Sequence, residues 1–230
     1  MPQEVISENT VILHDAAAGK WLHFTSPFEV VVAGAVSEVV PSLRRIEDLV
    51  ERYGWHAAGF ISYEASSAFD GALRTHEPGD FPLLWFGLFG KPEEMNLPAP
   101  DVSAYSLETM TPSIGRNDYD AAIRRIKEYI RSGDTYQVNY TLRLRSGFRG
   151  NPWHFFLSLV RAQPSGYAAY VNTGAIAVCS ASPELFFRLE GRNITCKPMK
   201  GTVRRGRTPA EDSALEQWLR HSEKNRAENL

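Results

Sequence analysis

The chain has 230 residues, of which 43% are hydrophobic and 23% charged, and its formal net charge is -2. This length can bury a large core and suits one large domain or two small ones. The nearly neutral charge gives no reason to expect binding to nucleic acid or to a membrane surface. The composition is that of an ordinary globular protein.

The two cysteines, Cys179 and Cys196, lie in apolar runs without CxxC spacing. They predict buried free thiols in a reducing compartment, and neither a disulfide framework nor a zinc site. Residues 1–10 lack a basic segment followed by an apolar core, and no run of the sequence approaches the length of a membrane span. We therefore expect a cytoplasmic protein.

The first part of the chain, residues 1–112, is predicted to combine short strands with one helix. Apolar residues at helical spacing predict the helix at residues 43–53. Continuous apolar runs predict buried strands at residues 30–35, 57–63 and 83–88. The Pro-rich stretch from Lys91 to Pro100 has little periodicity, which makes it the best candidate for a domain boundary.

The second part, residues 113–230, begins with the clearest helix of the sequence. Residues 118–131 place apolar side chains on one face, with Asn117 or Asp118 as cap and Gly133 as stop. Apolar and polar residues then alternate over residues 136–145, which predicts a strand with one buried face.

A further helix is predicted at residues 152–162, behind the cap residue Asn151. Strands are then predicted at residues 167–172, 175–180, 185–189 and 194–197.

The end of the sequence is predicted to be helical. Thr208 and Glu211 form the capping-box pattern of a helix. This helix is expected to bury Leu215, Trp218 and Leu219. The stretch 222–230 follows without a stop signal, so we expect the sequence to be part of a longer protein.

Five cationic residues lie close together in this nearly neutral sequence: Lys197, Lys200, Arg204, Arg205 and Arg207. Such a cluster can receive an anion, and Gly201-Thr202 adds backbone amides and a hydroxyl group suited to a carboxylate or phosphate. The alternative is a solvated basic turn before a helix. The segment lacks the GxxxxGK[ST] order, so it does not indicate a nucleotide-binding loop.

The spacing of the six histidines indicates no metal site. Glu223 and Glu228 carry carboxylate oxygens of the kind that magnesium binds. On their own, two such residues are typical of a polar helix face.

Lys200 and Glu184, sixteen residues apart, form the most informative pair of the sequence. A buried lysine at a strand end can become a neutral amine that attacks carbon. A carboxyl group on a neighbouring strand can protonate a leaving group. Without further context, both are ordinary solvated residues at strand ends.

Four segments, in this order and spacing, resemble the chorismate-utilising enzymes. They are SGDTYQVN at 132–139, SPELF at 182–186, PMKGT at 198–202 and RAENL at 226–230. The segment AGFISYEA at 58–65 is similar to the N-terminal region of the aminodeoxychorismate synthase branch. The resemblance therefore spans nearly the whole chain.

The resemblance implies a covalent amination with Lys200 as the nucleophile. Anthranilate and salicylate synthases carry alanine or another small residue at this position, whereas aminodeoxychorismate synthases carry lysine. In that branch the amine attacks C2 of chorismate while the 4-hydroxyl leaves. Ammonia then adds at C4 and expels the lysine, which divides one difficult substitution into two easier ones.

The resemblance also implies roles for five other residues. Glu184 is the general acid/base for the departing hydroxyl, a role that calls for a dry site. Gln137 stands where water-adding relatives carry a lysine, which favours amination over hydration. Gly201 and Thr202 match residues near the bound ring. Glu228 matches a carboxylate that holds Mg²⁺, which in turn binds the C1 carboxylate of chorismate.

The fold that the resemblance implies is α+β, with two packed, mainly antiparallel sheets and outer helices, of which this chain holds a part. Family members continue beyond the equivalent of Leu230 with further magnesium carboxylates and with residues that bind the second carboxylate of chorismate. We therefore expect that this chain alone does not turn over chorismate. The implied partner is a glutamine amidotransferase subunit that supplies ammonia for para-aminobenzoate and folate biosynthesis.

Three alternatives stay open on the sequence. The first is anthranilate synthase component I, against which Lys200 argues. The second is a non-catalytic module that binds an aromatic amino acid such as tryptophan. The third is an unrelated enzyme that uses a Schiff-base lysine.

Overall fold

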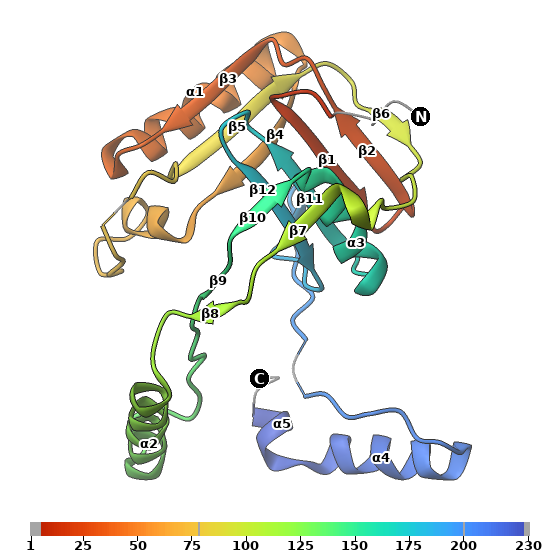
Figure 1. Ribbon diagram of the computed structural model, residues 1–230. Coiled ribbons are helices and arrows are strands. Elements are labelled where there is room, and N and C mark those ends of the chain that lie inside the picture. The colour runs from red at the N-terminus through yellow and green to blue at the C-terminus, as the bar shows by residue number, and fades with distance from the viewer. Residues whose placement is uncertain (1–5, 78, 200, 228–230) are drawn as a thin grey trace. The chain divides into compact units, whose positions relative to one another are not determined.

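The computed structural model describes residues 6–77, 79–199 and 201–227 (Figure 1). Their contacts form two compact units, which are described separately. One unit combines the residues up to Leu97 with those from Leu159 onward, and the other spans Pro98–Ser158. The first change of unit falls inside the predicted boundary stretch 91–100, whereas a division between residues 112 and 113 stays a prediction.

The larger unit contains two main antiparallel sheets. The first has the strand order β12-β11-β1-β2-β6, and the second has the order β3-β5-β4. The strands of the first sheet are β1 (Thr10–Asp15), β2 (Lys20–Phe24), β6 (Glu93–Met95), β11 (Tyr167–Asn172) and β12 (Ala177–Ser182). Those of the second are β3 (Glu29–Ala33), β4 (His56–Ile61) and β5 (Leu84–Phe89), and a short 3-10 helix, η1 (Tyr63–Ala68), follows β4.

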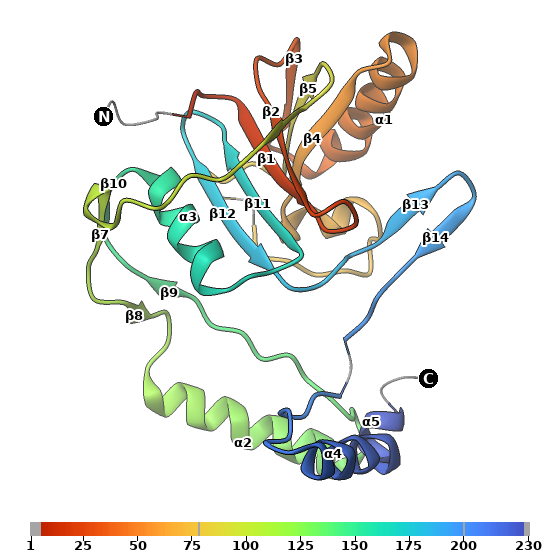
Figure 2. The same cartoon turned by 90° about the vertical axis from the view of Figure 1, so that its right-hand side faces the viewer.

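The two sheets share one hydrophobic core. Its buried members come from both sheets: Val11, Phe24, Ala58, Trp85, Phe89 and Val171. Removal of this apolar surface from water holds the sheets face to face. Helix α1 (Val36–Tyr53) covers the other face of the three-stranded sheet (Figure 2). The predicted α+β fold of packed antiparallel sheets with outer helices is thus confirmed.

Helix α1 begins at Val36 rather than at the predicted residue 43. The Glu38 carboxylate accepts hydrogen bonds from the backbone amides of Gly34 and Ala35, each at 3.0 Å. Amides at a helix start have no partner within the helix, so this carboxylate stabilises the first turn. Val39 and Ile46 are its buried residues.

The smaller unit contains two helices and short strand pairs. Its elements are η2 (Val102–Ala104), β7 (Tyr105–Leu107), β8 (Thr111–Pro112), α2 (Arg116–Ser132), β9 (Leu144–Arg145), β10 (Phe148–Gly150) and the start of α3 (Pro152–Ala162). Strand β7 pairs with β10, and β8 pairs with β9.

The helix predictions for this part of the chain are mostly confirmed. Helix α3 has the predicted bounds, and the Asn151 side chain accepts a hydrogen bond from the Trp153 amide at 2.9 Å. Helix α2 ends at Gly133 as predicted. The predicted caps Asn117 and Asp118 are wrong, because the helix starts behind Gly115 with no side-chain cap bond.

The predicted strand at residues 136–145 is wrong over most of its length. Only its last two residues form a strand, β9, and in the described part of the chain residues 136–143 have no strand partner. An alternating pattern forms a strand only when a neighbouring strand pairs with its backbone groups. The apolar members of the pattern therefore stay on the surface, with Tyr136 74% exposed.

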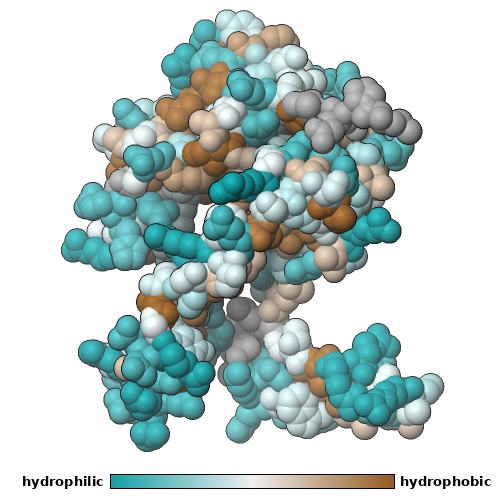
Figure 3. Space-filling view, in the orientation of Figure 1, coloured by the Kyte–Doolittle hydropathy of each residue, from teal (hydrophilic) through white to brown (hydrophobic). Residues whose placement is uncertain are grey.

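Helix α4 (Pro209–His221) begins behind Thr208 as predicted, but its expected burial is wrong. None of its residues is buried, and Trp218 is 59% exposed. A short helix, α5 (Glu223–Ala227), follows it. Apolar side chains also reach the surface elsewhere on the face shown in Figure 3.

The two thiols differ in their surroundings. Cys179 is half-buried in β12, whereas Cys196 is exposed, so the prediction of a buried thiol is wrong for Cys196. Cys196 follows the last residue of a short exposed hairpin and does not enter a sheet core. Within the described ranges, no helix is both long and apolar enough to cross a bilayer.

Candidate active site

The centre of the candidate site is a contact between two of the family-like segments. The Glu184 carboxylate accepts a hydrogen bond from the backbone amide of Met199 at 3.3 Å. This distance is at the long end of the range for such bonds. The contact nevertheless places the carboxyl group of the SPELF segment beside the PMKGT segment, which lies fifteen residues further along the chain.

A hairpin between the two segments explains why they meet. Strands β13 (Arg188–Glu190) and β14 (Asn193–Thr195) pair antiparallel, with Arg188 opposite Thr195. Gly191 closes the turn at φ 59°, a backbone region that glycine enters without strain. An antiparallel hairpin returns the chain to its starting point, so residues before β13 and after β14 come together (Figure 2).

The local turn at Glu184 is fixed by Ser182. The Ser182 hydroxyl donates to the backbone oxygen of Glu184 at 3.2 Å and accepts from the Glu184 amide at 3.4 Å. A serine that bonds the backbone two residues ahead is typical of a turn. Glu184 itself is exposed, so the dry surroundings implied for its acid/base role are not found in the described part of the chain.

Lys200 and Glu228, the implied nucleophile and metal ligand, lie outside the described residues. Their neighbours are described. Gly201 lies so close to helix α5 that an added Cβ atom would be 3.0 Å from the Asn225 side chain. Met199 therefore lies against the Glu184 carboxylate, and Gly201 lies against Asn225 of α5.

Thr202 follows Gly201 and is exposed. Gln137 belongs to the other compact unit and is also exposed. Its amide nitrogen donates to the side-chain oxygen of Asn139 at 3.4 Å. The roles of these residues near a bound ring stay predictions.

Two side chains of the cationic cluster form ion pairs with the first turn of helix α4. Arg204 pairs with Glu211 at 2.5 Å, and Arg205 pairs with Asp212 at 2.5 Å. The Arg205 guanidinium and the Gly206 amide hold the pKa of Asp212 below its usual value. Two of the five cations are therefore already neutralised, which weakens the interpretation of the segment as an open anion site.

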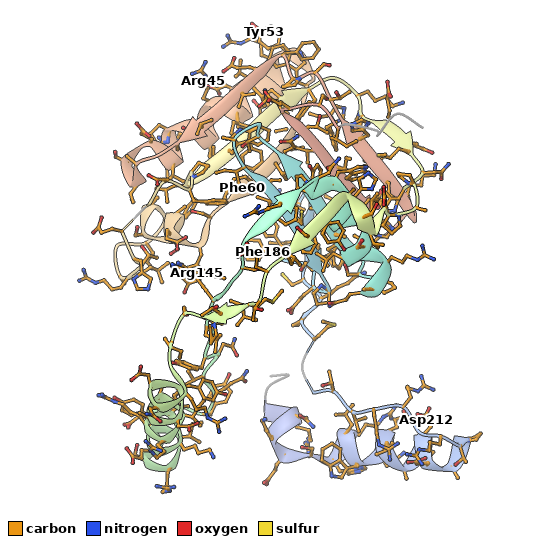
Figure 4. The ribbon with its side chains drawn as sticks, in the orientation of Figure 1. Arg45, Tyr53, Phe60, Arg145, Phe186 and Asp212 are labelled. Carbon is orange, nitrogen blue, oxygen red and sulfur yellow. The ribbon has the colours of Figure 1, made fainter. Side chains whose placement is uncertain are left out.

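Two cavities border the segment between β12 and β14. One, of about 500 Å³, has a mixed lining, whose polar and charged members include His14, Asp15, Tyr167, Arg188, Glu190 and Lys197. The other, of about 770 Å³, is lined by Leu43, Ile61, Tyr63, Phe69, Phe186 and Phe187, together with two serines. Phe186 stands out from the ribbon two residues after Glu184 (Figure 4), and it is 88% exposed.

These cavities could not be predicted from the sequence, because their walls come from distant positions. The cavity of about 500 Å³ is lined by the end of β1, by β11 and by the β13–β14 hairpin. His14 is held there by a hydrogen bond from its Nδ1 to the Gly166 carbonyl oxygen at 2.9 Å. Only Phe186, the last residue of the SPELF segment, and its neighbour Phe187 carried a local signal.

Magnesium does not fit the described residues. They contain no group of three or more Asp, Glu, His or Cys side chains able to hold a metal ion. Mg²⁺ requires near-octahedral oxygen coordination, and Glu223 is the carboxylate that α5 offers here. No chemical step is therefore assigned to a metal.

Comparison with known proteins identifies the family. The profile described as "chorismate binding enzyme" matches residues 8–230, almost the whole chain. The chain belongs to this family. The resemblance of the four segments is thereby confirmed.

The curated relatives of this family member carry two different activities in their names. Aminodeoxychorismate synthase component 1 of Klebsiella aerogenes is 37% identical over 133 residues, which are 57% of this chain and 30% of the relative. Anthranilate synthase component 1 of Cereibacter sphaeroides is 42% identical over 112 residues, 49% of this chain and 22% of the relative. Aminodeoxychorismate synthase component 1 of Escherichia coli is 38% identical over 115 residues, which are 50% of this chain and 25% of the relative. These matches cover less than a third of each relative.

Proposed function

We propose that this chain supplies the nucleophilic lysine and the acid/base carboxyl group of an aminodeoxychorismate synthase component 1. Lys200 carries the proposal, because a small residue at this position is the mark of the anthranilate branch. Chorismate is the proposed substrate, and a glutamine amidotransferase subunit is the proposed source of ammonia. The identities to relatives of both branches are similar, so they do not choose between the two reactions.

The proposed reaction has two displacements. The neutral amine of Lys200 bonds to C2 of chorismate, the ring double bond shifts, and the 4-hydroxyl leaves as water with a proton from Glu184. Ammonia then bonds to C4, the double bond shifts back, and the C2–N bond to Lys200 breaks. The lysine leaves as its neutral amine, and the new ammonium group at C4 returns one proton to Glu184. The net change is the replacement of the 4-hydroxyl by an amino group, with release of one water.

The hairpin geometry supports these roles. Glu184 contacts the amide of Met199, the residue immediately before Lys200. An acid and a nucleophile on adjacent segments can act on the same ring without a large movement of the chain. The exposure of Glu184 means that further protein surface must cover the site before it becomes dry.

The reaction can be tested in a chimera in which residues 8–230 replace the matching region of the Escherichia coli component 1. With chorismate and ammonium, we expect aminodeoxychorismate as the product. Lys200→Ala is expected to lower its formation by about a hundredfold or more, because the covalent route is lost. Lys197→Ala, which removes a lysine from the same segment, is the matched control.

Anthranilate as the main product of the unaltered chimera would overturn the proposal in favour of the anthranilate branch. The 230-residue chain alone is expected to form no aminodeoxychorismate. Measurable formation by that chain would contradict this expectation and show that the chain already holds a complete site.

A further inference from the structure

The segment that carries Gly201 and Thr202 is fastened to helix α4 by a compact set of contacts. We call this set the clasp, and its members are Arg204, Arg205, Gly206, Arg207, Glu211 and Asp212. Each of its two carboxylates binds one arginine side chain and one backbone amide. Glu211 accepts from Arg204 at 2.5 Å and from the Arg207 amide at 2.7 Å.

Asp212 makes the more specific half of the clasp. Its two oxygens accept from Nε and Nη2 of Arg205 at 2.9 and 2.5 Å, a bidentate geometry. One of them also accepts from the Gly206 amide at 2.7 Å. Single exposed ion pairs contribute little to stability, but bidentate pairs joined in a network are the exception.

Gly206 makes the clasp possible by its lack of a side chain. An added Cβ atom would lie 2.1 Å from the Asp212 amide nitrogen and 2.5 Å from the Asp212 Cα. Both are backbone atoms of the first turn of α4, and they cannot move without displacing the helix. The chain thus passes against the helix at a distance that only glycine allows.

The clasp fixes one end of a segment whose other end lies against α5. The chain that precedes α4 lies alongside this helix and runs in the opposite direction to it (Figure 4). Asp212 belongs to the first turn of α4. Arg204 and Arg205 meet that first turn, whereas Gly201 lies against Asn225 of α5. Ser222 joins the two helices, and its amide donates to the Trp218 oxygen at 3.0 Å. The segment, α4 and α5 therefore form one local body.

We propose that the clasp residues are positioning residues, which hold the Gly201–Thr202 segment at a fixed distance from α5. This inference rests on the proposed function, in which the same segment carries the nucleophile. The five cations of this region are then not primarily an anion site. Two of them, Arg204 and Arg205, instead hold the chain that follows Gly201 and Thr202 against α4.

Nuclear magnetic resonance of the full 230-residue chain tests the placement directly. In Gly206→Ala, and in Glu211→Gln combined with Asp212→Asn, we expect the Gly201–Asn225 proton contacts to disappear. Amide exchange at residues 206 and 207 should rise by about tenfold or more in the carboxamide variant. Glu216→Gln is a control for the loss of a carboxylate from the same helix, because it removes the Glu216–Arg220 ion pair and none of the hydrogen bonds of the clasp. Gly71→Ala is the control for the glycine change, because its Cβ would meet no atom within 4 Å.

The chimera described above tests the role in the reaction. Clasp variants should lower kcat/KM for chorismate by about tenfold or more, while both controls keep the unaltered value. Gly201–Asn225 contacts that persist in both clasp variants would overturn the inference, and so would lost contacts with unchanged kcat/KM. An unaltered chimera without activity would overturn the proposed function instead, and the resonance measurement would still decide whether the clasp holds the segment.

Discussion

The two cysteine side chains have different surroundings, which predicts different reactivity of their thiols. Cys179 lies in β12, where burial raises the pKa of its thiol to about 11. Cys196 sits beyond β14 and is exposed. The two thiols come from similar apolar runs of the sequence, so their difference arises from tertiary structure alone.

Alkylation by iodoacetamide should separate the two cysteines. At mildly alkaline pH we expect Cys196 to react about tenfold or more faster, because Cys179 is shielded and rarely ionised. Peptide mass spectrometry over time measures both rates in one sample. Equal rates would show that β12 does not shield its thiol, and Cys179→Ser supplies the rate of Cys196 alone.

Gly59 makes another prediction at the residue scale. It lies opposite Phe86 in the three-stranded sheet, and an added Cβ atom would be 2.0 Å from the Trp85 carbonyl oxygen. Gly59→Ala should lower the free energy of unfolding by about 1–3 kcal/mol, because strand β4 must shift to make room. Chemical denaturation measures the change, with Gly71→Ala as the control. A stability equal to that of the control would mean that β4 is not paired as described.

At the scale of elements, both a helix and a strand were predicted with their observed bounds, α3 and β11, whereas another predicted strand is mostly absent from the described residues. Pro152–Ala162 was predictable to the residue, because cap, period and stop all lie in the local sequence. The alternation over residues 136–145 is equally regular, yet most of it forms no strand. A helix satisfies its own backbone, whereas a strand needs a partner that its local sequence does not specify.

The first turn of α1 gives a pH-dependent prediction. Backbone amides of Ala35 and Gly34 donate to Glu38 and hold its pKa below the usual value. A lowered folded-state pKa stabilises the fold above the unfolded-state pKa, and this contribution is lost as the pH falls through the folded-state pKa. Glu38→Gln should therefore lower Tm at neutral pH, and the difference from the unaltered chain should shrink in acid.

Glu47→Gln on the exposed face of the same helix is the matched control, and its Tm should stay close to that of the unaltered chain at either pH. A Tm difference for Glu38→Gln that is the same at neutral and acid pH would contradict the capping role of this carboxylate.

At the scale of the whole molecule, the sequence indicated the protein family more clearly than the contacts of the candidate active site. Four short segments led to the family, and the comparisons confirm it. The sequence predicted only that the two segments lie on neighbouring strands. In the structure Glu184 contacts Met199 because the β13–β14 hairpin lies between them. The clasp was not anticipated, because its arginines were considered as free cations rather than as partners of Glu211 and Asp212.

The most direct test of the central claim is the covalent bond to Lys200. The chimera is incubated with chorismate in the absence of ammonia, quenched with acid and digested. Mass spectrometry then measures the masses of its peptides. We expect the peptide containing Lys200 to gain the mass of chorismate less one water. Addition of ammonium before the quench should remove this adduct. Formation of aminodeoxychorismate by the same preparation, with no adduct on Lys200 at any time, would contradict it.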